Sequence, residues 1–122
     1  MAQATITLTG EGVQEIQQLD MQISVIATIN INAVTAKRKV TAWLVSEVAN
    51  LLVGGTPQLV IGQQSVWRVP VLLTSSQVGQ VGQVGAVDVD TVSGQLFINS
   101  DLKKQIIANA KRAARSVSTT VG

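Results

Sequence analysis

The chain has 122 residues, a formal net charge of only +2, and no histidine, cysteine or tyrosine. The length suits one domain with one core, and the missing residue types exclude disulfide bonds, thiolate metal sites and imidazole catalysis. Hydrophobic residues make up 46% of the chain but aromatic residues only 2%. The core must therefore consist mainly of Val, Ile, Leu and Ala, a composition that favours strands.

The first 31 residues are predicted to form strands. Apolar residues and threonine alternate from Ala4 to Thr9, and the same period of two returns from Met21 to Ile31, the clearest strand pattern of the chain. No secretory signal pattern opens the chain, and no stretch is apolar enough to span a bilayer. We therefore expect a cytoplasmic protein with no membrane partner.

A helix is predicted from Asn32 onward, because the apolar period changes from two to that of a helix. One stripe contains Val40, Trp43, Leu44, Val48 and Leu51. Asn32 or Thr35 can cap the start, and glycines 54 and 55 with Pro57 are predicted to end the helix. Trp43 is expected to be the main side chain packed against a sheet.

Four strands are predicted next, over residues 58–61, 65–74, 84–91 and 95–99, separated by short turns. Such short connections favour an antiparallel meander. Pro70 lies inside the second strand and cannot donate to a ladder, so an edge or a bulge is expected there.

The last element is an amphipathic helix from Ser100 to about Ser118, with Ser100 and Asp101 as cap and first-turn residues. Its predicted buried stripe is Leu102, Ile106, Ala110, Ala113 and Val117. The predicted fold class is α+β, in one domain over residues 1–122. Residues 1–31 form N-terminal strands, 32–99 a central helix packed on an antiparallel β-meander, and 100–118 the C-terminal helix.

A basic flank on this last helix consists of Lys103, Lys104, Lys111, Arg112 and Arg115. It has two interpretations. The flank can meet nucleic acid by counterion release, or it can be a solvated face aided by the negative end of the helix dipole. The second is favoured, because no aromatic stacking partner and no helix-turn-helix pattern accompanies the flank.

The best candidate for catalysis is Asp88-Val89-Asp90-Thr91-Val92, which matches the Asp-x-Asp-x-Thr/Val string of Mg²⁺-dependent phosphotransferases. Asp88 and Asp90 share a face in a strand. Such enzymes also need a later lysine and further acidic ligands on a larger doubly wound sheet, but only Asp101 and about thirty residues follow, and no alternating strand and helix units precede. The alternative is a strand with Val87 and Val89 inward, in which Asp90 begins a turn by bonding to the backbone. The interpretation of Asp90 as a turn residue is preferred, and no catalytic, metal or cofactor site is expected.

Residues 77–85 repeat Gln-Val-Gly three times. Glycine-rich loops can cradle phosphate, but no Lys-Ser/Thr pair follows. A glycine-rich hairpin entry or mobile flap presenting Val78 and Val81 is the preferred interpretation.

The strand around Trp67 is apolar on both faces. Trp67, Val69, Val71 and Leu73 share one face, and Val66, Arg68 and Leu72 share the other. The N-terminal strands, the C-terminal helix or a second subunit must then cover the second face, and of these a second subunit, giving a homodimer, is expected. The candidate interaction surface comprises Trp67, Arg68, Leu72, Val78, Val81, Lys103, Lys104, Lys111, Arg112 and Arg115.

From Thr35 to Ile98 the chain resembles the PepSY-type module. The resemblance rests on the order of helix and strands, on the strand Trp67 to Leu73, and on the last hairpin from Val87 to Leu96 with its two aspartates and glycine. It implies a helix on an antiparallel meander with a chaperone, peptidase-inhibitory or protein-binding role, usually outside the cytoplasmic membrane. This chain departs from that pattern by its missing signal peptide and its added terminal elements.

The predicted function is a small non-catalytic interaction or regulatory module that binds a protein partner and itself. One alternative is a nucleic-acid-linked regulator, such as the antitoxin-like partner of a toxin, acting through the basic flank. The other is a metal-dependent phosphohydrolase acting through Asp88 and Asp90.

Overall fold

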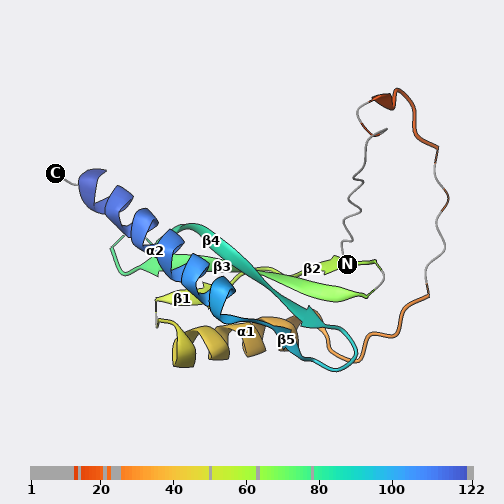
Figure 1. Ribbon diagram of the computed structural model, residues 1–122, viewed down its shortest axis with the longest axis horizontal. Coiled ribbons are helices and arrows are strands. Elements are labelled where there is room, and N and C mark those ends of the chain that lie inside the picture. The colour runs from red at the N-terminus through yellow and green to blue at the C-terminus, as the bar shows by residue number, and fades with distance from the viewer. Residues whose placement is uncertain are drawn as a thin grey trace.

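The computed structural model describes Val13, Gln22 and residues 15–20, 26–49, 51–62, 64–77 and 79–120, with side chains up to Arg115 (Figure 1). These residues form an α+β fold of two helices and an open antiparallel sheet of five strands. The elements are α1 (Ala33–Glu47), β1 (Leu52–Gly54), β2 (Gln58–Val60), β3 (Val66–Ser75), β4 (Gly79–Asp90), β5 (Leu96–Phe97) and α2 (Ser100–Thr120). The predicted fold class is confirmed for this part of the chain.

The sheet has the order β1-β3-β4-β5, and β2 also pairs with β3. Strands β1 and β2 therefore lie end to end along the same side of β3. The four predicted strands and their antiparallel meander are confirmed, but β4 begins at Gly79, so most of the predicted flap belongs to the strand. Strand β1 is not among the predicted strands, because the helical spacing of the sequence places its residues at the end of the first helix.

Helix α1 begins where the sequence predicts and ends earlier. The Asn32 side chain accepts a bond from the Thr35 amide at 2.8 Å, which confirms Asn32 as the cap. The helix ends at Glu47 rather than at the glycines. Leu52 pairs with Leu73 in the sheet and is buried, and this pairing removes residues 52–54 from the helix.

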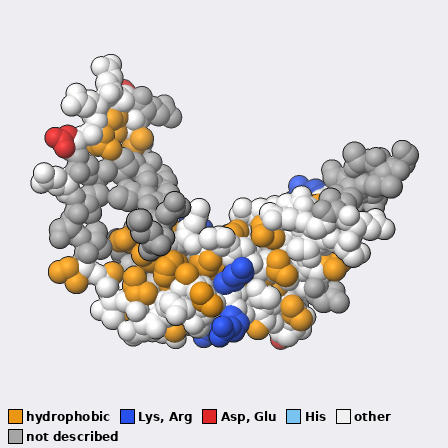
Figure 2. Space-filling model, turned by 180° about the vertical axis from the view of Figure 1, so that it is seen from behind, with side chains coloured by type: hydrophobic (Ala, Val, Ile, Leu, Met, Phe, Trp, Pro, Cys, Tyr) orange, Lys and Arg blue, Asp and Glu red, His pale blue; other side chains and the backbone are white. Residues whose placement is uncertain are grey.

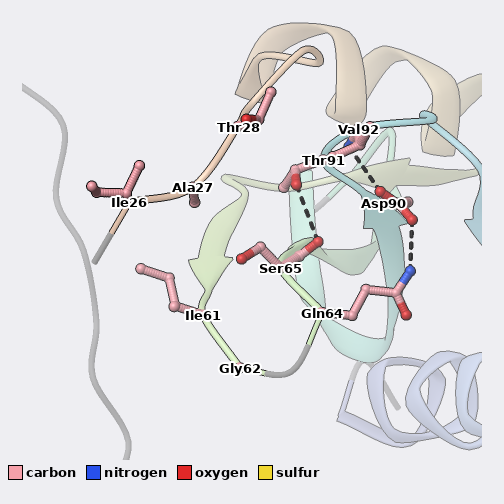
Figure 3. A pocket seen from close by; sticks show the side chains of 10 residues that line it. All are labelled: Ile26, Ala27, Thr28, Ile61, Gly62, Gln64, Ser65, Asp90, Thr91 and Val92. Atoms are coloured by element: carbon pink, nitrogen blue, oxygen red, sulfur yellow. Dashed lines mark hydrogen bonds between the residues drawn. The ribbon is translucent and has the colours of Figure 1, made fainter. Parts of the chain in front are cut away.

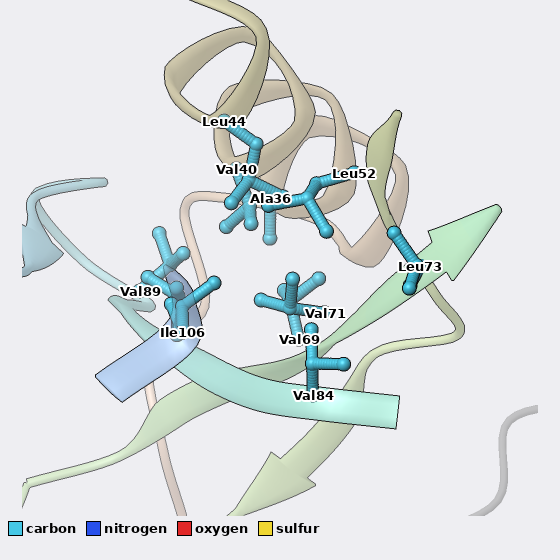
Figure 4. Packing of buried hydrophobic residues seen from close by; sticks show 11 residues of the cluster. Ala36, Val40, Leu44, Leu52, Val69, Val71, Leu73, Val84, Val89 and Ile106 are labelled. Carbon is cyan, nitrogen blue, oxygen red and sulfur yellow. The ribbon is translucent and has the colours of Figure 1, made fainter. Parts of the chain in front are cut away.

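The core lies between α1 and the sheet (Figure 4). Ala36, Val40 and Leu44 of α1 point toward Val69 and Val71 of β3, and all five are completely buried. Trp43 is only half-buried and packs at the margin of this cluster. The prediction that Trp43 is the main packed side chain is wrong, because Leu44, one position on, points at the sheet.

Both helices contribute to the same side of the sheet. Gly54, Val71 and Gly85 are cross-strand neighbours and so share a face. A Cβ atom on Gly54 would lie 3.2 Å from the backbone of α1, and one on Gly85 would lie 2.9 Å from Ile106 of α2. We call this side the core face.

Pro70 lies in a central strand, not at an edge. Its carbonyl accepts a bond from Gly55 N at 2.7 Å, and the amide position of a strand residue points to the same side as its carbonyl. That side is where the chain between β1 and β2 leaves the ladder. The missing donor is thus accommodated by a break in the neighbouring strand, and a register shift with β4 follows directly after Val71.

Helix α2 runs beside β4 along the stretch that β5 leaves unpaired (Figure 1). Its first cap is Asn99, whose side chain accepts a bond from Leu102 N at 2.7 Å, and not Ser100 as predicted. Ile106 enters the core, and Asn109 donates to the Val84 carbonyl at 3.0 Å. The helix thereby covers an edge that would otherwise offer unpaired backbone groups.

The predicted N-terminal strands are not found where the structure describes the region. Residues 26–31 form no strand, and Ile26 is 99% exposed. The amides of Asn30 and Ile31 both donate to one acceptor, the Thr91 carbonyl, so the backbone of this segment forms no ladder with the sheet. The predicted strand from Ala4 to Thr9 lies outside the described residues. No described helix is long and apolar enough to cross a membrane.

Candidate functional site

The side of the sheet opposite the core face carries both apolar and charged side chains. Pairing places Arg68 beside Asp88, Pro70 beside Ala86, Leu72 beside Val53, and Phe97 beside Asp88. These side chains are exposed or partly accessible, and the first turns of α2 lie beside Arg68, Ala86 and Asp88. We call this side of the sheet the open face and define it by Val53, Arg68, Pro70, Leu72, Ala86, Asp88 and Phe97.

Arg68 and Asp88 form the polar centre of the open face. The guanidinium donates to the carboxylate through two bonds, Nε to Oδ1 at 2.9 Å and Nη2 to Oδ2 at 3.0 Å. The bonded carboxylate and its charge raise the pKa of Arg68 above its ordinary value. Because side chains facing each other across two strands supply both charges, the face is locally neutral.

A hollow of about 480 Å³ lies between the open face and the start of α2. Its walls are Arg68, Ala86, Asp88, Phe97, Asn99, Asp101, Leu102 and Gln105. Phe97 is 40% exposed. An aromatic side chain exposed beside a hollow can anchor a partner, since such anchors contribute much of the binding energy of protein interfaces.

A second hollow, of about 440 Å³, lies where residues 26–28 pass the loop before β3 and the turn after β4 (Figure 3). Its polar side chains hold these loops together. Gln64 donates to Asp90 Oδ2 at 2.6 Å, and the Thr91 hydroxyl donates to the Ser65 carbonyl at 3.2 Å. We interpret this hollow as a structural junction.

Asp90 has the turn-forming role that the sequence predicts. Its Oδ1 accepts bonds from the amides of Val92 at 2.7 Å and Ser93 at 3.3 Å, and Val87 and Val89 are fully buried as expected. The Val92 amide, then Gln64 and Ser93, lower the pKa of Asp90. Within the described residues, no group of three or more acidic side chains is placed to hold a metal.

The predicted interaction residues divide between several surfaces. Arg68 and Leu72 lie together on the open face. Trp67 lies on the core face, half-buried, and its indole donates to the Ile31 carbonyl at 2.6 Å. Val81 is half-buried against the core, and Val78 lies outside the described residues.

The basic residues of α2 also divide. Lys103 is half-buried beside Trp43 and Glu47. Lys104, Lys111, Arg112 and Arg115 are exposed, and Arg112 donates to Asn109 of the preceding turn. This flank points away from the sheet and is separate from the open face.

Sequence reasoning missed Val53, Ala86 and Phe97 as members of the open face. Alternation along each strand predicts which of its residues share a face. Which residues of different strands lie side by side depends on the register between the strands, and the sequence pattern does not give that register. Figure 2, which views the molecule from behind the side seen in Figure 1, shows hydrophobic side chains along much of its length with a group of Lys and Arg side chains near the middle.

Comparison with known proteins gives no similar protein: no family model matches the chain, and neither a curated protein nor a solved structure matches it. The resemblance to the PepSY-type module therefore stays a prediction.

Proposed function

We propose that this protein is a non-catalytic interaction module that pairs with a second copy of itself through the open face. One observation carries the proposal: helices bury the central residues of the core face, whereas the apolar residues of the open face stay exposed or partly accessible. An apolar surface of this kind is typical of a protein–protein contact. A binding role is also what the resemblance to the PepSY-type module implies.

The size of the open face suits a modest dimer interface. The ten residues of β3 span about 33 Å, and three adjacent strands span about 14 Å. The resulting footprint is on the order of 500 Å². This is below the roughly 800 Å² that each partner contributes to a standard interface, so the expected contact is a small one.

Charge supports a second copy as the occupant. A two-fold interface brings the same patch of both copies together, so a face with a single sign of charge would repel itself. The open face has Arg68 and Asp88 side by side. Two copies stacked antiparallel can place each guanidinium near the carboxylate of the other, with the apolar residues packed around them.

The test is the mass of the protein in solution at micromolar concentration, measured by light scattering during gel filtration. We expect twice the mass of the chain. Leu72→Arg and Phe97→Arg each add an unpaired charge to the apolar part of the open face, where a buried lone charge costs several kcal/mol. Both variants should elute as monomers.

The matched control is Val45→Arg, on the outer surface of α1, where Val45 is 51% exposed. It introduces the same charge on a different surface and should leave the dimer intact. Circular dichroism checks that all three variants are folded. A wild-type protein of monomeric mass, or a dimer that survives both open-face variants, would overturn the proposal.

A further inference from the structure

Helix α2 carries a narrow basic stripe on its outer surface. Lys104, Ala108, Lys111, Arg112 and Arg115 follow one another at helical spacing and are all exposed. With 3.6 residues per turn, the stripe lies almost opposite the buried Ile106 and spans about 16 Å. We call these five residues the basic stripe.

The helix dipole does not explain the basic stripe. The negative end of a helix attracts cations only within its last turn, and α2 continues to Thr120 with no basic residue in that turn. Lys104 lies near the positive end of the helix, where a cation is unfavourable. The sequence favours a solvated face aided by the dipole, and the contribution of the dipole is therefore not supported.

Intrahelical ion pairs do not explain the basic stripe either. Asp101 lies one turn before Lys104, but residues 102–120 include no aspartate or glutamate, so Lys111 and Arg112 have no acidic neighbour one turn away on the helix. Asp101, in the first turn, is the only acidic residue of the helix. The helix therefore has an excess of positive charge on one side, which a polyanion would complement.

The shape of the stripe favours duplex nucleic acid among polyanions. Ala108 is exposed between the cations, which keeps this side of the helix narrow. A helix of about 10–12 Å diameter fits the major groove. The last turns of α2 project beyond the strands (Figure 1), which lets them approach a duplex. Aromatic side chains for stacking on single strands are missing from α2.

We propose that the basic stripe of α2 binds the phosphate backbone of duplex nucleic acid, without reading its sequence. Lysine and arginine displace condensed counterions from phosphates, and each contact makes binding more sensitive to salt. The proposal does not depend on pairing through the open face, since the stripe lies on a different surface.

The experiment measures binding of the full chain to a fluorescent mixed-sequence DNA duplex by anisotropy at several salt concentrations. Four phosphate contacts predict that affinity falls about a hundredfold between roughly 50 and 200 mM salt. Lys104→Glu/Lys111→Glu should weaken binding at least about tenfold at the lower salt concentration, because it removes two contacts and adds two repulsive charges.

The matched control is Lys37→Glu/Arg38→Glu. Both residues are exposed on α1, and the variant changes net charge by the same amount. It should bind within about twofold of wild type. Three results would overturn the proposal: no binding at low salt, equal loss in both variants, or competition by polyglutamate as effective as competition by unlabelled duplex. An equal affinity for single-stranded DNA would contradict the choice of a duplex.

Discussion

The two faces of β3 differ in what their side chains do, although they alternate along a single strand. Val69 and Val71 point into the core and are fully buried. Arg68, Pro70 and Leu72 alternate with them, point to the open face and remain partly accessible. One set contributes to folding through burial from water. The other contributes little to the fold of a single chain and is available for association.

Truncating a leucine to alanine should lower the free energy of unfolding more on the core side than on the open face. Leu44→Ala removes a completely buried side chain and should lower the free energy of unfolding by about 2–5 kcal/mol. Leu72→Ala, on the open face, should cost less than about 1 kcal/mol in the isolated chain. Urea denaturation, with both changes made in the monomeric Phe97→Arg background, separates folding from association. Similar costs at the two positions would contradict the division between the faces.

A smaller effect is expected where a side chain is added to the core face. A Cβ on Gly85 would lie 2.9 Å from Ile106 Cγ1, so Gly85→Ala should destabilise the protein by about 1–3 kcal/mol through overpacking. Gly82→Ala, in the same strand, meets no atom within 4 Å and is the control. Thermal denaturation of both variants measures the difference. If Gly82→Ala is the more damaging change, α2 does not pack on β4 as described.

The smallest effect concerns the turn that follows β4, and it depends on pH. The pKa of Asp90 is lowered in the folded state by the bond from the Val92 amide and then by Gln64. Its stabilising contribution is therefore complete above the pKa of the unfolded chain, about 4, and is lost as the pH falls through the lower folded value. Wild type should be more stable than Asp90→Asn at neutral pH, with denaturation midpoints that converge in acid. A difference that stays constant down to pH about 2 would show that the charge of Asp90 plays no part.

Local sequence signals predicted the structure well where the interaction itself is local. The Asn32 cap and the Asp90 turn join residues two or three positions apart, and both follow from side-chain chemistry. The meander likewise follows from short turns and alternation. The ion pair of Arg68 with Asp88, by contrast, joins residues twenty positions apart and depends on the register of two strands.

The wrong predictions have a common physical cause. Leu51 and Leu52 continue the spacing of the helix, but Leu52 gains more by pairing with Leu73 in the sheet. Residues 26–31 alternate like a strand, yet the described part of the chain offers them one carbonyl, that of Thr91, instead of a ladder. In both cases a backbone partner far away in the sequence decides between helix, strand and coil. The apolar pattern of a single segment carries no information about that partner.

The break between β1 and β2 bears on how far association can proceed. One edge of the sheet is divided into two strands of three residues each, separated at Gly55 and Pro57, and the other is occupied along much of its length by α2. Neither edge offers the long unpaired ladder on which further strands add to form a fibril. In the proposed dimer, contact between copies is thereby directed to the open face, where a two-fold pair would bury the apolar surface of both members and leave none for a third copy.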